Sequence, residues 1–431
     1  MESIWTKTAM RPTFKKLQGD ISMDVLVIGG GMAGILCAYI LKERGIPCVL
    51  VEAERICGGI TKNTTAKITL QHGLIYDETA RRFGMDGARL YYKAQNKALE
   101  KYRQLCQKIS CDYEDQPSFV YSQKDLRKLE REAEVLNRIG CPADLVRSLP
   151  LPVSALGAVR IPRQGQFHPL KFAFHLAKDL PIYEHTKVKR LSCGTAFTDG
   201  GRIQFQKAIV ATHFPFINKH GSYFLKLYQH RSYVLALENA PDVHGMYVDE
   251  DEKGLSFRNH QGLLLLGGGS HRTGKQGGNW KELEAFAHKY YPQAKILNRW
   301  ATQDCMTLDD IPYIGPYSAR TPNLFVATGC NKWGMTSSMV AAQILGDMVE
   351  EKENEYAAVF SPSRTLLRPQ LFLNIVESAM GLLTPTAPRC PHLGCALKYN
   401  PVEHSWDCSC HGSRFMEDGK LIDNPARKNL S

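Results

Sequence analysis

The sequence predicts an α/β fold with three parts: a parallel sheet covered by helices, an antiparallel sheet inserted into it, and a small β-rich module at the C-terminal end. A strand, glycine turn, helix and second strand follow one another over 25–52, and a buried strand with its helix returns at 323–350. Between them lie short alternating apolar runs, which are typical of a mostly antiparallel sheet. These runs are 233–238, 245–248, 255–258 and 262–266.

The first unit carries a glycine turn between its strand and its helix. After the apolar strand the chain reads Gly-Gly-Gly-Met-Ala-Gly from Gly29 onward. In such a turn Gly29 permits the tight bend, Gly31 lets a pyrophosphate approach the backbone, and Gly34 lets the helix pack against the strand. Met32 and Ala33 lie at the helix start, where free N–H groups face the phosphates.

An acidic residue completes this unit. Glu52 follows the second strand about twenty residues after the turn, where a ribose hydroxyl needs a carboxylate acceptor. The next loop holds Thr61, Thr64 and Thr65, small hydroxyl residues that suit a segment lying along a cofactor. Strand, helix and acid together predict a dinucleotide site, whereas the glycine run alone also fits a plain structural turn.

Periodicity predicts the remaining elements of the body. Residues 77–136 have helical spacing of apolar residues with many charges, and the proline-rich stretch 142–162 predicts irregular chain. Residues 267–272 predict a glycine turn beyond the inserted sheet, and 280–290 a helix.

The chain is basic, with a net charge of +11 that is scattered along it. No basic run resembles a nucleic-acid-binding arm, so nucleic acid is not an expected partner. The charge indicates either a solvated basic surface or a docking face for an acidic, ferredoxin-like redox protein. Residues 1–20 lack an apolar centre and the longest apolar run is broken by glycines, so we expect neither a signal peptide nor a transmembrane segment.

The thirteen cysteines divide into two groups. Those before Cys390 lie singly along the chain and fit reduced cytosolic thiols, which predicts a cytoplasmic location. The other four crowd into the C-terminal end and call for a separate explanation.

The body, from residue 20 to about 355, resembles a flavoprotein of the D-amino acid oxidase superfamily, to which glycine and sarcosine oxidases belong. The matching features are the Gly29 turn, Glu52, Val188 in its strand, the strand end at Thr212, and the closing segment from Gly329 to Thr336. This resemblance implies FAD as the cofactor. A nicotinamide enzyme is the alternative for the first glycine turn alone, but no second complete glycine fingerprint is present.

The same resemblance implies residue roles. Glu52 would hold the adenosine ribose, and Val188 would supply backbone contacts near the adenine. Gly334, Met335 and Thr336, at a helix start, would stabilise negative charge on the flavin. The Thr-Thr-Ala-Lys loop at 64–67 departs from the Arg-Asn pair more usual at that place.

Potential metal ligands cluster near the C-terminal end. The chain holds Cys390-x-His392 and Cys408-x-x-His411, with fifteen residues between the two pairs. Two thiolates and two imidazoles suit an asymmetric [2Fe–2S] site, with the cysteines on one iron and the histidines on the other. A Cys2His2 zinc site is one alternative, and an all-cysteine cluster that adds Cys395 and Cys410 is another.

Both segments resemble the two cluster-binding loops of Rieske proteins, over residues 388 to about 427. This resemblance implies a disulfide between Cys395 and Cys410 and a hydrogen bond from Ser413 to a cluster sulfide. Rieske domains normally carry a further sheet before the first ligand loop, and little chain precedes it here. We therefore expect a shortened module that depends on the flavin domain for stability.

These observations predict a Rossmann-like FAD-binding domain with an inserted antiparallel-sheet substrate domain over 1–355, followed by the cluster module. The apolar helix expected at 366–383 fits either docking between domains or a membrane surface. The expected parts are FAD binding at about 20–80, 150–220 and 300–355; substrate binding at about 81–149 and 221–299; a helix and Pro-rich linker at 356–387; and the [2Fe–2S] module at 388–431.

A flavin takes two electrons as a hydride, whereas an iron–sulfur cluster passes them singly. The pairing predicts a dehydrogenase that oxidises a C–N bond of an amine or amino acid and sends electrons through the cluster to a protein or quinone acceptor. Two alternatives remain: the reverse direction of flow, and an electron-transfer or redox-sensing protein without a small organic substrate.

Candidate substrate residues lie on the inserted sheet, where an arginine would clamp a carboxylate bidentately. A structural role is the alternative for each, and the roles of His72 and His213 stay open. The candidates are Tyr233, Arg258, His271 and Arg272.

Overall fold

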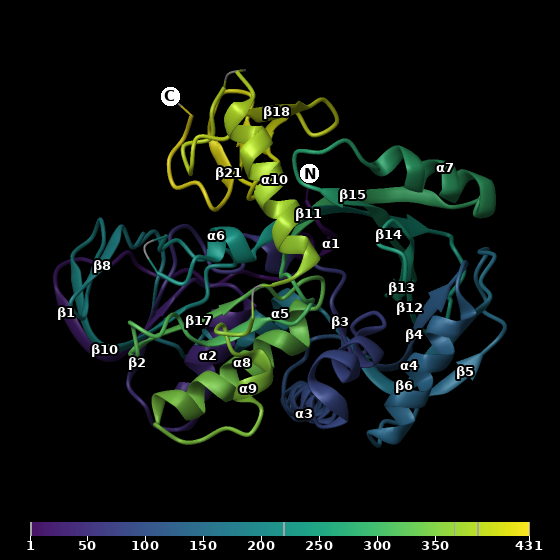
Figure 1. Ribbon diagram of the computed structural model, residues 1–431, viewed down its shortest axis with the longest axis horizontal. Helices are drawn as coiled ribbons and strands as arrows, with labels where there is room; N and C mark the ends of the chain where they lie inside the picture. Colours follow the sequence, from purple (N-terminus) through teal and green to yellow (C-terminus); the bar gives the residue numbers. More distant parts are fainter. Residues whose placement is uncertain (1, 219, 366, 386–387, 431) are drawn as a thin grey trace.

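The computed structural model describes residues 2–218, 220–365, 367–385 and 388–430. Figure 1 shows two large sheets in separate lobes of the body, with the C-terminal module (yellow) above the region where they meet. The fold is α/β with a small β-rich third part, as the sequence predicts.

The first sheet carries the glycine turn. Its central strand pairs in parallel with strands on both sides, and residues Val25–Ile28 of that strand are buried. This is the arrangement expected for a continuous apolar run in a parallel sheet. In spatial order its strands are β16 (Tyr313–Pro316), β17 (Leu324–Thr328), β10 (Arg202–Val210), β1 (Ile21–Ile28), β2 (Cys48–Val51) and β7 (Ile182–Tyr183), with β8 (Arg190–Ser192) and β9 (Thr195–Phe197) beside β10.

The second sheet is mostly antiparallel, and β12 pairs with β4 in parallel. Its order is β15 (Lys295–Met306), β11 (Tyr228–Glu238), β14 (Leu263–Arg272), β13 (Ser256–His260), β12 (Met246–Asp249), β4 (Glu114–Ser122), β6 (Gly157–Gln166) and β3 (Lys67–Ile68), with β5 (Asp144–Val146) beside β6.

The helices surround these two sheets. Helix α2 begins directly after the glycine turn and packs against α8, the helix of the returning segment. The helices are α1 (Ile4–Thr8), α2 (Met32–Glu43), α3 (Ile75–Cys106), α4 (Leu126–Arg138), α5 (Pro169–Ala177), α6 (Tyr223–Lys226), α7 (Trp280–Tyr290), α8 (Gly334–Val349), α9 (Ala357–Phe360) and α10 (Pro369–Leu383), with the 3-10 turn η1 (Ile60–Asn63).

Three local predictions were wrong because tertiary pairing overrides local pattern. The stretch 77–136 is not continuous helix: β4 separates α3 from α4, and its residues from Ser118 on are buried. The stretch 142–162 contains β5 and the start of β6, and 267–272 continues β14 instead of turning. The glycines there leave room for neighbours, since a Cβ on Gly268 would lie 2.7 Å from the Leu255 side chain.

The expected domain limits also differ from the sheet pairing. Strand β6 and the end of β15 fall within 150–220 and 300–355, the ranges expected for FAD binding, yet they belong to the second sheet. The reason is that β6 pairs with β4 from Ser122 to Glu114, so its backbone hydrogen bonds lie in that sheet.

The C-terminal module has a sheet of four short strands, all of which follow the first ligand loop. Before that loop the described chain contributes an isolated bridge between Arg389 and Ala396, which agrees with a shortened module. Thr386 and Ala387 of the expected linker lie outside the described residues. The strands are β18 (Leu397–Asn400), β19 (Ser405–Cys408), β20 (Arg414–Met416) and β21 (Leu421–Asp423).

Helix α10 joins the body to this module. Its buried residues are Asn374 and Gly381, whereas Phe372, Met380 and Leu383 are exposed. The helix therefore packs against the rest of the protein along one narrow face. Within the described parts of the chain, no helix has both the length and the apolar character needed to cross a bilayer.

Candidate functional site

A cavity of about 1350 Å³ runs from the glycine turn to the second sheet. Most residues predicted to bind the cofactor line it, although they come from distant segments. Those lining it are Gly29, Gly31, Met32, Ala33, Glu52, Thr61, Thr64, Thr65, Val188, Thr212, Gly329, Gly334 and Met335.

The glycine turn leaves its backbone open to this cavity. Gly29 has a φ of 108°, and a Cβ there would lie 2.6 Å from the Ala211 carbonyl oxygen. Gly34 does not line the cavity, because it packs so closely that a Cβ would lie 1.8 Å from the Gly29 carbonyl oxygen. At Gly31, by contrast, a Cβ would meet only the Thr61 hydroxyl at 3.5 Å, so a ligand can approach the backbone at this point.

Glu52 is held in place at the cavity wall. Its carboxylate accepts hydrogen bonds from the N–H groups of Gly30 (2.7 Å) and Glu54 (2.9 Å). The Glu52 carbonyl accepts from the N–H of Thr186 at 2.8 Å, which places 186–188 beside the acid. Burial raises the pKa of Glu52.

The loop at 62–66 has its carbonyl groups bonded to buried side chains from elsewhere. Ser3 donates to the Lys62 carbonyl, and the Trp300 and Trp5 indoles donate to the next two at 2.9 and 2.8 Å. Arg258 donates to the carbonyls of residues 65 and 66, both at 2.8 Å. Arg258 is fully buried and does not line the cavity, so its candidacy as a substrate clamp was wrong. It fixes the loop instead.

Lys67 follows this loop and faces the cavity. Its ammonium group lies 3.3 Å from the Thr65 hydroxyl. Burial, together with the nearby Arg258 guanidinium, lowers the pKa of Lys67 to about 7. A lysine in this state changes charge near neutral pH.

The start of α8 forms another part of the wall of this cavity. Gly334 and Met335 line the cavity, but Thr336 is buried behind them and its hydroxyl donates to the Thr69 carbonyl at 3.0 Å. His72 lines the cavity too, 2.9 Å from the Thr336 hydroxyl and stacked on Trp333. Burial lowers the pKa of His72 to about 3, so its ring is neutral at physiological pH.

Of the other substrate candidates, only Tyr233 lines the cavity. The His271 ring stacks on Tyr233 and its Nδ1 lies 3.1 Å from the Gly269 carbonyl oxygen, away from the cavity. Arg272 is directed at the C-terminal module. The predictions for His271 and Arg272 as substrate-contacting residues were therefore wrong, because both side chains pack behind the cavity wall.

Among the charged residues of the cavity wall, three that were not predicted from the sequence can be related to a substrate. They are Asp304, Asp310 and Lys332, and Lys332 donates to the Ser270 hydroxyl at 2.8 Å. Burial raises the pKa of each of the two aspartates to about 6. Lys332 precedes the predicted closing motif, but its own charge carried no distinct signal.

In the C-terminal module, the predicted metal ligands meet as two pairs. The Cys390 and Cys408 thiols lie within hydrogen-bonding range of each other, and the His392 and His411 ring centroids are 4.9 Å apart. Among the described residues, Nδ1 of each histidine is buried without a hydrogen-bond partner. Buried polar atoms normally have partners, so these nitrogens fit metal ligation. The donor set suits a mixed-ligand [2Fe–2S] cluster.

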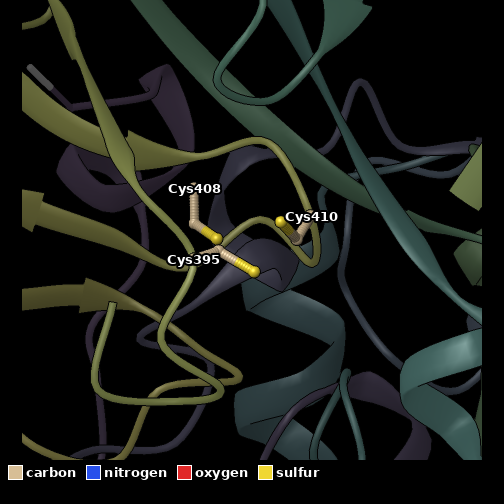
Figure 2. A group of neighbouring side chains, drawn as sticks. All are labelled: Cys395, Cys408 and Cys410. Carbon is tan, nitrogen blue, oxygen red and sulfur yellow. The ribbon is translucent and has the colours of Figure 1, made fainter. Parts of the chain in front are cut away.

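Figure 2 shows three cysteines of this module close together. The Sγ atoms of Cys395, Cys408 and Cys410 lie within 4.8 Å of one another, and all thirteen cysteines are free thiols. The expected Cys395–Cys410 disulfide is thus not formed in this structure, in which both thiols also contact Cys408. Gly381 of α10 covers them, since a Cβ there would lie 2.6 Å from Cys410 Sγ.

The second ligand loop is held by the second sheet of the body. Arg272 donates to the carbonyls of Ser409 and Cys410 at 2.9 and 3.0 Å. Gln229 donates to the next carbonyl, and Gln303 to that of Gly412, each at 2.9 Å. These side chains come from β14, β11 and β15, which are neighbours in the sheet, so 409–412 rests on a preformed surface.

A buried ionic network also joins the module to the cavity wall. Glu403 forms an ion pair with Arg231 and a second, of 3.0 Å, with Arg414. It also accepts a hydrogen bond of 3.0 Å from the Tyr233 hydroxyl. Although burial favours the neutral acid, the two guanidinium groups lower the pKa of Glu403 to about 2. The module therefore contacts the back of the substrate region.

The cluster-ligand pair lies next to the cavity. The Phe214 ring lines the cavity, and its centroid is 6.2 Å from that of His392 and 6.5 Å from that of His411. His213 also lines the cavity, and its Nε2 lies 3.2 Å from the Gln229 amide oxygen. The Phe214 ring thus belongs to the cavity wall and also lies beside the two predicted cluster histidines.

Comparison with known proteins agrees with this geometry. Residues 24–348 match the FAD dependent oxidoreductase (DAO) family, and residues 357–431 match the Rieske [2Fe-2S] domain. The chain belongs to the DAO family and carries a Rieske domain at its C-terminal end. The Rieske match begins at 357 and so includes α10, upstream of the limit of 388 expected from the ligand loops.

The same two-part architecture occurs in a relative. The Bacillus subtilis (strain 168) protein YhfW, named as a Rieske 2Fe-2S iron-sulfur protein, is 35% identical over 100% of this chain and 97% of its own length. Gamma-glutamylputrescine oxidoreductase of Escherichia coli (strain K12) is 27% identical over 46% of this chain and 50% of its own. The glycine oxidase of Geobacillus kaustophilus has a similar fold, with a TM-score of 0.68 and 20% identity over 80% of this chain and 99% of its own.

This flavin–Rieske protein is therefore an FAD-dependent oxidoreductase with FAD and a [2Fe–2S] cluster as cofactors. Three features near the cavity were not predicted from the sequence: the Phe214 ring beside the cluster histidines, Glu403, and residues 423–427. No local motif marks such residues, because their positions depend on how the Rieske module packs against the body.

Proposed function

We propose that the protein is a dehydrogenase that oxidises a C–N bond of an amine or amino acid and passes the electrons one at a time through its Rieske cluster to an external acceptor. The observation that supports this proposal most directly is the position of Phe214. Its side chain lines the cavity and also contacts the imidazole rings of His392 and His411. The names of the flavoprotein relatives, which act on amines or amino acids, support the substrate class.

The binding residues follow from the cavity. The Gly29–Gly34 turn, Glu52, Val188 and the start of α8 would hold FAD, and Cys390, His392, Cys408 and His411 would hold the cluster. When bound, FAD supplies two-electron oxidation of the substrate. The helix start at Gly334 would favour negative charge at the cofactor.

The substrate end of the cavity presents charge of both signs. Asp304 and Asp310 would attract a protonated amine, and Lys332 would orient a carboxylate if the substrate carries one. Because no predicted arginine clamp reaches the cavity, Lys332 replaces it in the proposal. Tyr233 would form part of the pocket wall, with its hydroxyl donating a hydrogen bond to Glu403.

The acceptor would be a redox protein or a quinone, and the net charge of +11 favours an acidic, ferredoxin-like protein. We also propose a cytoplasmic location, since the cysteines before Cys390 lie singly along the chain, as is typical of reduced cytosolic thiols.

The test is anaerobic mixing of the holoprotein with a panel of amines and amino acids, followed by flavin absorbance and freeze-quench EPR of the cluster. We expect a panel member to bleach the flavin and the reduced-cluster signal to follow. If no amine bleaches the flavin while a reduced ferredoxin reduces it, the protein is an electron carrier and the proposal is wrong.

Phe214 provides a variant for the same experiment. Phe214→Leu should slow cluster reduction while flavin bleaching keeps its rate, because the intervening ring is lost. Phe224→Leu is the matched control, since the Phe224 ring lies 6.4 Å from His411 but is not part of the cavity wall. Equal cluster reduction in both variants would argue against a route past Phe214.

A further inference from the structure

The tail of the Rieske module lines the same cavity as the glycine turn with its segment 423–427, which begins at the last residue of β21. Asp423, Asn424 and Arg427 line it together with Lys187 and Val188 of the body. The cavity wall therefore comes from two modules, one at each end of the chain.

Asn424 joins the tail to the first sheet. Its side-chain amide donates to the Thr212 carbonyl at 2.8 Å, two residues after β10 ends. Its own carbonyl accepts from the Gln229 amide, also at 2.8 Å. Gln229 holds the second ligand loop as well, so one side chain links tail, loop and body.

Arg427 joins the tail to the segment beside Glu52. Its guanidinium donates to the carbonyls of Val188 (2.8 Å) and Lys189 (2.9 Å) and lies 4.9 Å from the centre of the Phe216 ring. Lys187 donates in return to the Arg427 carbonyl at 3.0 Å. Hydrogen bonds to a charged donor are about twice as strong as neutral ones, so this contact fixes 187–189.

The tail is also tied to the cluster loop. The N–H of Ala426 donates to the Ser413 hydroxyl at 2.9 Å, two residues after the ligand His411. The position of the tail therefore depends on the folded second loop.

We propose that residues 423–427 are part of the FAD site and enclose the adenosine half of the cofactor, so that FAD affinity depends on the Rieske module. This rests on FAD lying along Glu52 and Val188, as proposed above. The N–H of Thr186 donates to the Glu52 carbonyl, so the segment that the tail contacts, 187–189, follows directly on a residue bonded to the expected ribose acceptor. Since binding linkage is reciprocal, FAD would in turn stabilise the module.

The test is titration of full-length apoprotein with FAD, followed by flavin fluorescence. Arg427→Ala should weaken FAD binding about tenfold, because a doubly bonded guanidinium is lost. ADP, which contains the adenosine half alone, should lose affinity by a similar factor. Lys428→Ala is the matched control, an exposed cation of the same tail that is not part of the cavity wall.

Iron content and the EPR signal of each variant show whether the module still folds. If Arg427→Ala lowers the iron content, Arg427→Lys replaces it, since it keeps the charge and loses the two-carbonyl fork. FAD and ADP affinities equal to those of the parent protein in a cluster-loaded variant would overturn the inference. The titration needs no substrate, so a protein that oxidises no amine leaves this inference standing while the proposed function fails.

Discussion

Arg272 shows how one residue can serve an entirely different site from the one its strand suggests. It lies on a strand of the substrate sheet, and its guanidinium donates to two carbonyls of the second cluster loop and to Asn374 of α10 at 2.9 Å. Burial lowers the pKa of Arg272, yet its several acceptors hold the charged form in place. The side chain supports the cluster loop.

We predict that Arg272→Ala weakens cluster retention. Loss of the charge-assisted hydrogen bonds should destabilise the loop by about 3 kcal/mol. The measurement is iron content per FAD, with thermal loss of cluster absorbance. Lys275→Ala removes a nearby, partly exposed cation whose partner is Glu377 of α10, and it should cost less than about 1 kcal/mol. Equal iron retention in the two variants would contradict the role of Arg272.

His72 predicts acid sensitivity. Burial holds its pKa at about 3, below the usual 6.5, so the unfolded chain binds more protons between these values. Stability should therefore fall as the pH drops from 6.5 toward 3, by about 2 kcal/mol at pH 5 from this residue. The measurement is urea unfolding against pH. His72→Asn should show a shallower decline, whereas His244→Asn, a change at an exposed histidine, should follow the parent protein.

At the scale of elements, helix α10 connects the body to the Rieske module and packs against the cysteines of that module. The sequence indicated a helix at 366–383, because its apolar spacing is local, but not which face would be buried. The structure seats it through Asn374 and Gly381, with Gly381 in contact with Cys395 and Cys410. The helix packs so closely against these two thiols that the position of Gly381 has no room for a side chain.

Gly381→Ala tests this packing. The added Cβ would lie 2.6 Å from Cys410 Sγ, so the helix or the loop must move, at a cost of about 1–3 kcal/mol. We expect earlier thermal loss of the cluster absorbance. Met380→Ala is the neighbouring control, since that side chain is 59% exposed and should be nearly neutral. An unchanged transition in both would show that α10 is not seated at Gly381.

The elements also show what a sequence can and cannot reveal here. The glycine turn, Glu52 and the two ligand pairs follow from short-range spacing that their chemistry imposes, and they were predictable. Strand β4 was not predictable, because it pairs with strands that lie far along the chain. One partner is β6, and the other is β12, which follows β4 by more than a hundred residues. The roles of Arg258 and Arg272 depend on loops distant in sequence, so neither has a local signature.

On the scale of the whole molecule, the FAD-binding body and the Rieske domain lie within one chain, and the Phe214 ring of the cavity wall lies beside the predicted cluster histidines. Rieske and flavin modules share side-chain contacts at Gln229, Gln303 and Glu403, which are buried or nearly so. Such an interface holds the modules in one relative position, so transfer between them should not require a second molecule.

We therefore predict that the rate of cluster reduction after flavin reduction is independent of protein concentration. The measurement is anaerobic stopped-flow absorbance over a wide concentration range. Added salt should leave the rate unchanged, since buried contacts are little screened. A rate that rises in proportion to concentration would mean that electrons pass between neighbouring chains.

The support of residues 409–412 by three strands of the body has a consequence for biogenesis. Domains near the N-terminal end generally fold first as a chain leaves the ribosome. The carbonyls of this loop find their donors on β11, β14 and β15 only once that sheet has formed. Iron delivery must then come after maturation of the oxidoreductase body, which makes the metal centre the last part of the protein to be built.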